Sequence, residues 1–129
     1  MTKIDSIGKT DIGLRRSNNE DAFYVDGKKR ICMVADGMGG AAAGEIASGI
    51  FAETTREIFA NSSKGPDPSA TELVQAVFQT ANERILNHIQ ENPSHKGMGC
   101  TAELIAFSND EVVLGHIGDS RTYRFRNGN

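Results

Sequence analysis

The stretch from Val34 to Gly44, VADGMGGAAAG, constrains the fold of this chain more than any other. The apolar run at 31–35 predicts a strand buried on both faces, and this strand ends at a carboxylate, Asp36. Glycines at 37, 39 and 40 follow, and small residues then open a helix. A carboxylate at the tip of a rigid strand can hold a hard cation, and the same carboxylate can serve as a helix cap. This stretch alone leaves both interpretations open.

Length and composition predict a single soluble globular domain. The chain has 129 residues, of which 38% are hydrophobic and 24% charged. A net charge of -3 gives no support for nucleic acid or an anionic membrane, so we expect neither as a partner. No apolar stretch approaches the ~20 residues of a membrane helix, and residues 1–9 lead us to expect no secretory signal. Cys32 and Cys100 lie far apart among apolar residues, so we expect buried reduced thiols and a cytoplasmic location.

Short strands are predicted in the first third of the chain. Residues 10–14 alternate between polar and apolar, and residues 22–25 and 30–35 have the composition of strands. The Asp-Gly pair in the turn at 26–29 predicts that the last two strands form an antiparallel hairpin.

The predicted hairpin suggests a role for the acidic residues that precede it. The polar run at 15–21 is by itself typical of a solvated loop. In the hairpin, however, Glu20 and Asp21 come level with Asp36, so we expect three carboxylates to converge at one edge of the sheet. Since like charges so placed repel, a divalent cation is the usual way to stabilise them.

Helices are predicted in the middle of the chain. Apolar residues recur at helical spacing from about residue 42 to 60. Residues 69–72, Ser-Ala-Thr-Glu, have the signature of a capping box and open a second helix that runs to about residue 90. The short connection predicts that the two helices are antiparallel neighbours. We expect His88 and His95 on the surface.

The last part of the chain predicts an antiparallel meander. Strands are expected at 101–107 and 111–117, and residues 122–126 alternate like a further strand. Because strands and helices do not alternate along the chain, we expect an α+β fold with the helices on one outer face of an antiparallel sheet. The chain ends in Asn127-Gly128, a strong hairpin signal without a following strand, so we expect a fragment cut between two strands.

The glycine-rich stretch also fits a dinucleotide-binding fingerprint. Gly37, Gly39 and Ala42 have the spacing of the Rossmann motif, after a strand and before a helix. Two observations count against this interpretation. The charge of Asp36 would face the pyrophosphate, and the helix is followed by another helix where the motif needs a parallel strand.

Four short motifs in order resemble those of the protein phosphatase 2C family, the metal-dependent serine/threonine phosphatases, and look most like its bacterial branch. The resemblance covers about residues 10 to 129 and is specific because all four motifs occur in sequence order. They are RSNNED at 16–21, DGMGG at 36–40, GCTA at 99–102 and GDSR at 118–121.

The resemblance implies a set of metal ligands. Asp36 matches the carboxylate that bridges two metal ions, and Gly37 matches the residue whose backbone carbonyl is a ligand. Glu20 and Asp21 match acidic positions that bind the second ion directly or through water. Asp119 matches an aspartate that in the family can bind a third, weaker ion. Mn²⁺ and Mg²⁺ prefer such oxygen ligands.

The resemblance also implies a fold and an activity. The fold is a four-layer αββα sandwich, in which antiparallel helix pairs flank two antiparallel sheets, and this chain supplies roughly its N-terminal half. The activity is hydrolysis of phosphoserine and phosphothreonine by a metal-activated water at a two-metal centre. Arg16 matches the arginine that holds the substrate phosphate. The implied partners are phosphorylated proteins, such as the substrates of a serine/threonine kinase.

The chain departs from the family at some positions. Met38 stands where some members have a histidine proposed as general acid, and Cys100 replaces a threonine or serine. Apart from the resemblance, His116 could approach the metals, although a core histidine is the more common case. We expect Ser120 to bond the backbone of its turn and Arg121 to pair locally.

The family's later motifs, which supply two further aspartates, are absent. We therefore expect residues 1–129 to be a partial phosphatase domain, truncated at its C-terminal end, that is inactive and poorly folded alone. The alternative interpretation is a non-catalytic pseudophosphatase or phosphoprotein-binding module.

Overall fold

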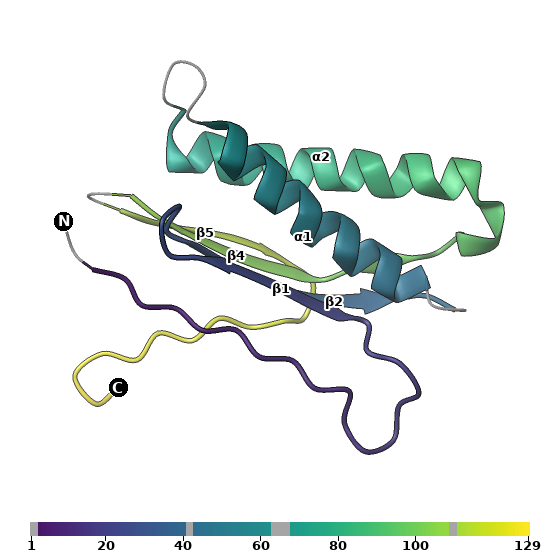
Figure 1. Cartoon of the computed structure of the whole chain (residues 1–129), viewed down its shortest axis with the longest axis horizontal. Helices are drawn as coiled ribbons and strands as arrows, with labels where there is room; N and C mark the ends of the chain where they lie inside the picture. The colour runs from purple at the N-terminus through teal and green to yellow at the C-terminus, as the bar shows by residue number, and fades with distance from the viewer. Residues whose placement is uncertain (1–2, 41–42, 63–67, 109–110) are drawn as a thin grey trace.

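The computed structural model describes residues 3–40, 43–62, 68–108 and 111–129. Two helices cover one face of an antiparallel sheet, and extended segments at both ends of the chain lie on the other side of it (Figure 1). This is one helical layer and one sheet of the predicted four-layer architecture, so the α+β class is confirmed. No helix in the described ranges is long and apolar enough to cross a membrane.

The sheet has the strand order β1-β2-β4-β5, and the short strand β3 pairs with the end of β2. All of its pairs are antiparallel. The elements are β1 (Asp21–Asp26), β2 (Ile31–Met38), α1 (Ala43–Asn61), α2 (Ala70–Glu91), the short 3-10 helix η2 (Pro93–His95), β3 (Gly99–Cys100), β4 (Ala102–Phe107) and β5 (Val112–Ile117).

The predicted hairpin is confirmed, but its turn has a different basis. Asp26 pairs with Ile31 across the strands, and its carboxylate accepts the backbone N–H groups of Lys28 and Lys29 at 2.9 and 3.0 Å. The bond from Lys29 is the main reason why the pKa of Asp26 is lowered. The residue with positive φ is Arg30, at 57°, and no residue of the Asp-Gly pair adopts such a φ.

Strand β2 is longer than predicted. Gly37 and Met38 pair with β3, so Asp36 lies inside the strand and does not end it. The sequence could not show this because β3 is only two residues long and follows 60 residues later in the chain. The carboxylate of Asp36 is therefore fixed by sheet pairing on both sides of its position.

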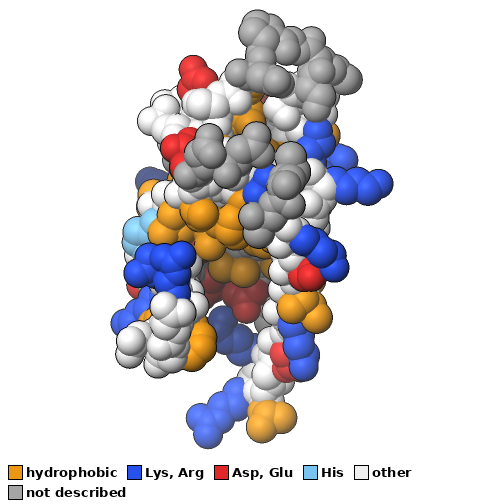
Figure 2. Space-filling view, turned by 90° about the vertical axis from the view of Figure 1, so that its left-hand side faces the viewer, with side chains coloured by type: hydrophobic (Ala, Val, Ile, Leu, Met, Phe, Trp, Pro, Cys, Tyr) orange, Lys and Arg blue, Asp and Glu red, His pale blue; other side chains and the backbone are white. Residues whose placement is uncertain are grey.

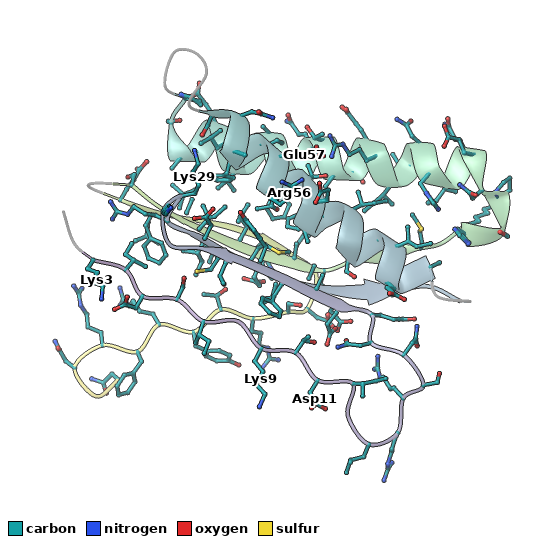
Figure 3. All side chains as sticks on the ribbon, in the orientation of Figure 1. Lys3, Lys9, Asp11, Lys29, Arg56 and Glu57 are labelled. Carbon is teal, nitrogen blue, oxygen red and sulfur yellow. The ribbon has the colours of Figure 1, made fainter. Side chains whose placement is uncertain are left out.

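The two helices and their packing agree with the prediction. Ser69 and Glu72 form the capping box at the start of α2, with both reciprocal hydrogen bonds present. The helices pack against each other and are linked by an ion pair of 2.7 Å between Arg84 and Glu57, which Figure 3 labels on α1. The core between them and the sheet consists of Ile31, Met33, Ala35, Phe51, Phe59, Val74, Val77, Ala81, Ala102, Leu104 and Ala106.

Two predicted strands are wrong. In the described part of the chain, residues 10–14 and 122–126 have no strand assignment, because no neighbouring strand pairs with them. The Asn-Gly turn beyond the second segment does form. Asn127 and Gly128 have φ of 52° and 84°, and Arg126 and Asn129 exchange two backbone hydrogen bonds of 2.7 and 3.0 Å.

The prediction that His88 and His95 are surface residues holds only in part. Both are half-buried, and their rings stack with centroids 5.2 Å apart. Their nitrogens Nε2 and Nδ1 lie 2.9 Å apart in a hydrogen bond. The turn that carries His95 folds back on the end of α2, which spacing along the chain could not show.

Strand β2 and the first turn of α1 approach each other too closely for side chains. A Cβ added to Gly37 would lie 1.9 Å from the carbonyl oxygen of Gly44. One added to Gly44 would lie 2.6 Å from Glu20 Oε2 and 2.9 Å from the carbonyl carbon of Gly37. The glycines therefore set the distance between the helix and the sheet.

We predict opposite effects of alanine at two glycines. Gly37→Ala should lower the free energy of unfolding by about 3 kcal/mol, because backbone atoms must move apart. Gly49→Ala, at an exposed helix position with nothing within 4 Å of the added carbon, should raise it by about 1 kcal/mol. Denaturant titration of both variants, made in the longer protein of which this chain is expected to be a part, checks this, and a neutral Gly37→Ala would contradict the close approach.

Candidate metal centre

Asp21 and Asp36 stand directly opposite each other on neighbouring strands. They are register partners in the β1–β2 ladder, and both are exposed. The residues on either side of Asp36, Ala35 and Gly37, are buried toward the helices. Because side chains alternate along a strand, both carboxylates project from the face of the sheet opposite the helices.

The pKa of Asp36 reflects this crowding. It is raised above its usual range, first by partial desolvation of the carboxyl and then by the charge of Asp21 and a hydrogen bond with it. The charge of Asp119 raises it further, whereas the charge of Arg16 lowers it. Three other predicted site residues, Asp21, Asp119 and Arg16, are therefore close enough to Asp36 to act on it electrostatically.

Asp119 reaches this position through the turn that follows β5. Gly118 has a φ of 94°, and a Cβ there would lie 2.7 Å from the methyl group of Thr101. The turn thus packs on Thr101. The Ser120 hydroxyl forms a hydrogen bond with the Thr101 hydroxyl, which corrects our expectation that it bonds the backbone of its own turn. Arg121 does pair locally, with the Tyr123 hydroxyl at 3.4 Å.

Thr101 is the residue that joins these parts, and sequence reasoning had treated it as an ordinary strand residue. Its backbone N–H donates to the carbonyl oxygen of Asp36 at 2.8 Å, and its hydroxyl accepts the N–H of Asp36 at 3.1 Å. The sequence signal for this role is that Thr101 and Ser120 each place a hydroxyl group in one of the four motifs.

Glu20 behaves differently from its neighbour Asp21. Its carboxylate lies against Gly44 at the start of α1, which is the helix side of the strand. Its carbonyl oxygen accepts the N–H of Gly37 at 3.0 Å and the hydroxyl of buried Ser48 at 2.6 Å. The expected convergence of three carboxylates is thus not what the structure shows, because adjacent residues of an extended chain point to opposite sides.

The carboxylate oxygens of the site are of the chemical type that a hard divalent cation prefers, but they are too few to complete its ligand shell. Among the described residues, no three His, Cys, Asp or Glu side chains lie close enough together to hold a metal ion. Asp21 and Asp36 offer paired carboxylate oxygens whose mutual repulsion a Mg²⁺ or Mn²⁺ ion would relieve. Such an ion needs further ligands from water, Asp119 or groups beyond this chain.

A cavity of about 330 Å³ lies between the sheet and the N-terminal extended segment, and both carboxylates line it. Lys9 and Asp11, which belong to that segment below the sheet in Figure 3, also line the cavity. Viewed from one end of the molecule, Figure 2 shows a hollow below a group of hydrophobic side chains, with acidic side chains deep inside it. The carboxylate pair is therefore open to small solutes.

Three other candidate residues have other surroundings. His116 is neither a core histidine nor at the carboxylate pair, since its side chain is 51% exposed and bonds Glu103. Met38 is 62% exposed. Burial, with a smaller contribution from the charge of Asp36, raises the pKa of the Cys100 thiol to about 11, so this thiol is neutral at pH 7.

Comparison with known proteins places the chain among bacterial phosphatases. The profile of the family described as "Protein phosphatase 2C" matches residues 14–129. The chain is 36% identical to the serine/threonine protein phosphatase PstP of Mycobacterium tuberculosis over 93% of its own length and 22% of that protein. It is 37% identical to a putative protein phosphatase 2C-type of Streptococcus pyogenes, over 88% of its length and 47% of that protein.

Solved structures give the same result. The catalytic domain of PstP, in complex with two manganese ions, superimposes with a TM-score of 0.84 at 36% identity, covering 94% of this chain and 50% of that one. The phosphatase MsPP of Mycobacterium smegmatis, in complex with cacodylate, gives a TM-score of 0.77 at 34% identity, covering 94% and 48%. The chain thus spans half or less of the length of these relatives.

The raised pKa of Asp36 predicts how pH and metal affect stability. Because the folded-state pKa lies above the unfolded value of about 3.8, ionisation of Asp36 destabilises the metal-free fold as pH rises through this window. Asp36→Asn should remove this loss, so that the metal-free variant is more stable than the parent at pH 7. Thermal melts of the metal-free parent and of Asp36→Asn between pH 3 and 7 check whether the parent loses stability relative to the variant as the pH rises.

The same variant should lose its response to Mn²⁺. At one hundred times the dissociation constant, Mn²⁺ should stabilise the parent by about 2.7 kcal/mol and Asp36→Asn by far less. Equal Mn²⁺ stabilisation of parent and variant would show that the cation binds elsewhere.

Proposed function

Because the chain belongs to the protein phosphatase 2C family, we propose that the protein that carries it is a metal-dependent protein serine/threonine phosphatase. The observation that carries this proposal is the register of β1 and β2, which sets Asp21 opposite Asp36 in an open cavity. It is supported by the likeness to PstP, whose catalytic domain was solved with two manganese ions.

In this proposal, Asp36 would be the ligand shared by two Mn²⁺ or Mg²⁺ ions, and the backbone carbonyl of Gly37 would be a ligand of one of them. Asp21 and Glu20 serve the second ion, directly or through water, and Asp119 serves a third, weaker one. When bound, such ions activate a water for attack on phosphorus and neutralise the charge of the phosphoryl oxygens. The raised pKa of Asp36 supports the assignment, since partial desolvation and the charges of Asp21 and Asp119 disfavour its ionised form, which a bound cation would favour.

Glu20 has its carboxylate on the opposite side of the strand from the carboxylates of Asp21 and Asp36. Its carboxylate faces the start of α1, so a role at the second ion requires a bridging water or a change in its rotamer. Its carbonyl oxygen already fixes Gly37 and Ser48 in place. We assign Glu20 the water-mediated part of the ligand shell.

Arg16 holds the phosphate of the substrate. It lies exposed in the loop before β1, and its charge reaches Asp36. A planar guanidinium can donate two parallel hydrogen bonds to phosphate oxygens, which a lysine cannot. The substrates are phosphorylated serine and threonine residues of proteins that a kinase has modified.

The activity belongs to a protein longer than this chain. The chain spans half or less of its relatives, and among its described residues no three His, Cys, Asp or Glu side chains lie close enough together to hold a metal ion. We propose that residues 1–129 are a partial domain, inactive alone, whose metal shell and second sheet come from the rest of the protein. A non-catalytic phosphoprotein-binding module would bind phosphopeptide in the longer protein without hydrolysing it.

We predict that Asp36→Asn abolishes turnover in the longer protein. Removing the charge of a bridging ligand should lower the Mn²⁺-dependent kcat at least about a thousandfold, as expected when metal-derived stabilisation of several kcal/mol is lost. Hydrolysis of a phosphothreonine peptide, with Asp5→Asn as a control, measures this. Near-parental turnover would rule out the assignment, and a parent that binds the peptide without turnover would support the binding module.

We predict that Arg16→Ala mainly raises KM. Loss of a charge-assisted contact to phosphate should raise it about tenfold, while the Mn²⁺ affinity stays within about twofold. The neighbouring variant Arg15→Ala is the control. Steady-state kinetics and calorimetric Mn²⁺ titration on the same preparations separate the two effects. A large loss of Mn²⁺ affinity with unchanged KM would mean that Arg16 supports the carboxylates.

A further inference from the structure

A buried carboxylate lies on the open face of the sheet, next to the candidate metal centre. Glu103 is only 4% exposed, although it belongs to the face that the helices leave uncovered. The strand registers set it in one row with Phe23, Val34 and His116. Because side chains on one face are two residues apart, this row is adjacent to the row of Asp21, Asp36 and Thr101.

Both oxygens of Glu103 have partners. Oε2 accepts the hydroxyl of Thr122 at 2.6 Å, and Oε1 pairs with His116 Nδ1. A buried carboxylate without such partners would strongly destabilise the fold, so these contacts are needed for Glu103 to be ionised here. An apolar residue could fill the same space, so packing alone does not explain a glutamate at this position.

Two contacts, one at Ser120 and one at Thr122, tie the last segment of the chain onto the sheet. After Gly118 the chain turns back beneath the sheet (Figure 1), and the side chains of Ser120 and Thr122 both form hydrogen bonds with residues on the sheet side of this turn. Ser120 bonds Thr101, the residue that is bonded to the backbone of Asp36, and Thr122 bonds Glu103. Asp119 lies immediately before these two attachment points.

We propose that Glu103 is a positioning residue for the metal centre, which anchors Thr122 and thereby holds Asp119 beside Asp36. Asp119 lies between the turn at Gly118, which packs on Thr101, and Ser120, which bonds the Thr101 hydroxyl, so both of these attachments are to a single residue. A second anchor two residues later fixes the direction of the segment and, with it, the place of the Asp119 carboxylate. His116 holds the other oxygen of Glu103, so that the carboxylate keeps one rotamer.

This inference rests on the proposed function, since it gives Asp119 a role at a metal ion. It adds a residue that lies outside all four motifs and that no spacing argument indicated. Its consequence is specific. Loss of the anchor should weaken the ion that Asp119 serves and spare the tighter ions at Asp36.

The test uses Thr122, because this residue is exposed and its replacement leaves the core intact. Thr122→Val removes the hydroxyl at nearly constant volume, and Thr122→Ser restores it. Glu103→Gln, which keeps the shape and one acceptor, is compared with Glu83→Gln on the exposed side of α2. All variants are made in the longer protein that carries this chain.

Two readouts are measured on the same preparations. Hydrogen exchange of residues 118–122 in metal-free protein reports whether the segment is held, and calorimetric Mn²⁺ titration reports each affinity. We expect Thr122→Val to speed the exchange and to weaken only the weakest Mn²⁺ site, each about tenfold, as for the loss of one hydrogen bond to a charged group. Thr122→Ser and Glu83→Gln should match the parent in both readouts. The exchange rate and the weakest Mn²⁺ affinity of Glu103→Gln should lie between those of the parent and those of Thr122→Val.

Faster exchange with unchanged Mn²⁺ affinities would overturn the proposal, and so would equal weakening of all sites or a Thr122→Ser variant as impaired as Thr122→Val. Failure of the proposed function would give a different result. The parent would then bind Mn²⁺ at the weak site without hydrolysing phosphopeptide. The comparison of Mn²⁺ affinity and hydrogen exchange between the variants would still decide the role of Glu103.

Discussion

The close approach of β2 and α1 at Gly37 and Gly44 is the contact on which the site depends. The backbones meet so closely there that neither residue has room for a Cβ. The carbonyl oxygen of Glu20 joins this contact by accepting hydrogen bonds from Gly37 and from Ser48 of α1. One helix, one strand and the residue before β1 are thus held together at a single point.

This contact determines how the acidic residues are presented. With Glu20 fixed by its carbonyl, strand alternation turns its side chain to the helix and sends Asp21 to the open face, opposite Asp36. Two carboxylates at neighbouring positions of a rigid ladder cannot move apart, so the charge of Asp21 adds to partial desolvation in raising the pKa of Asp36. A cation that binds between them would favour the ionised form of both. The rigidity of the sheet is therefore part of the chemistry.

Local patterns could be predicted from the sequence, and long-range contacts could not. The hairpin, the capping box at Ser69 and the turn at Asn127-Gly128 depend on residues a few positions apart, and all three form. The polar contacts around the site join residues far apart in the chain and depend on how the elements pack, so no spacing rule reveals them. They include Ser48 to Glu20, Asp36 to Thr101 and Thr122 to Glu103, at separations of 28, 65 and 19 residues. The same limit explains why segments 10–14 and 122–126 alternate like strands but have no partner here.

Whether a cation binds at the Asp21–Asp36 pair is tested most directly by anomalous diffraction at the manganese edge from crystals of the longer protein grown with Mn²⁺. Two strong peaks should lie beside the Asp36 carboxylate, one of them within about 2.3 Å of the Gly37 carbonyl oxygen, as for oxygen ligands of such ions. A weaker third peak should lie near Asp119. Manganese bound elsewhere, with water alone between Asp21 and Asp36, would show that this pair is not the cation site.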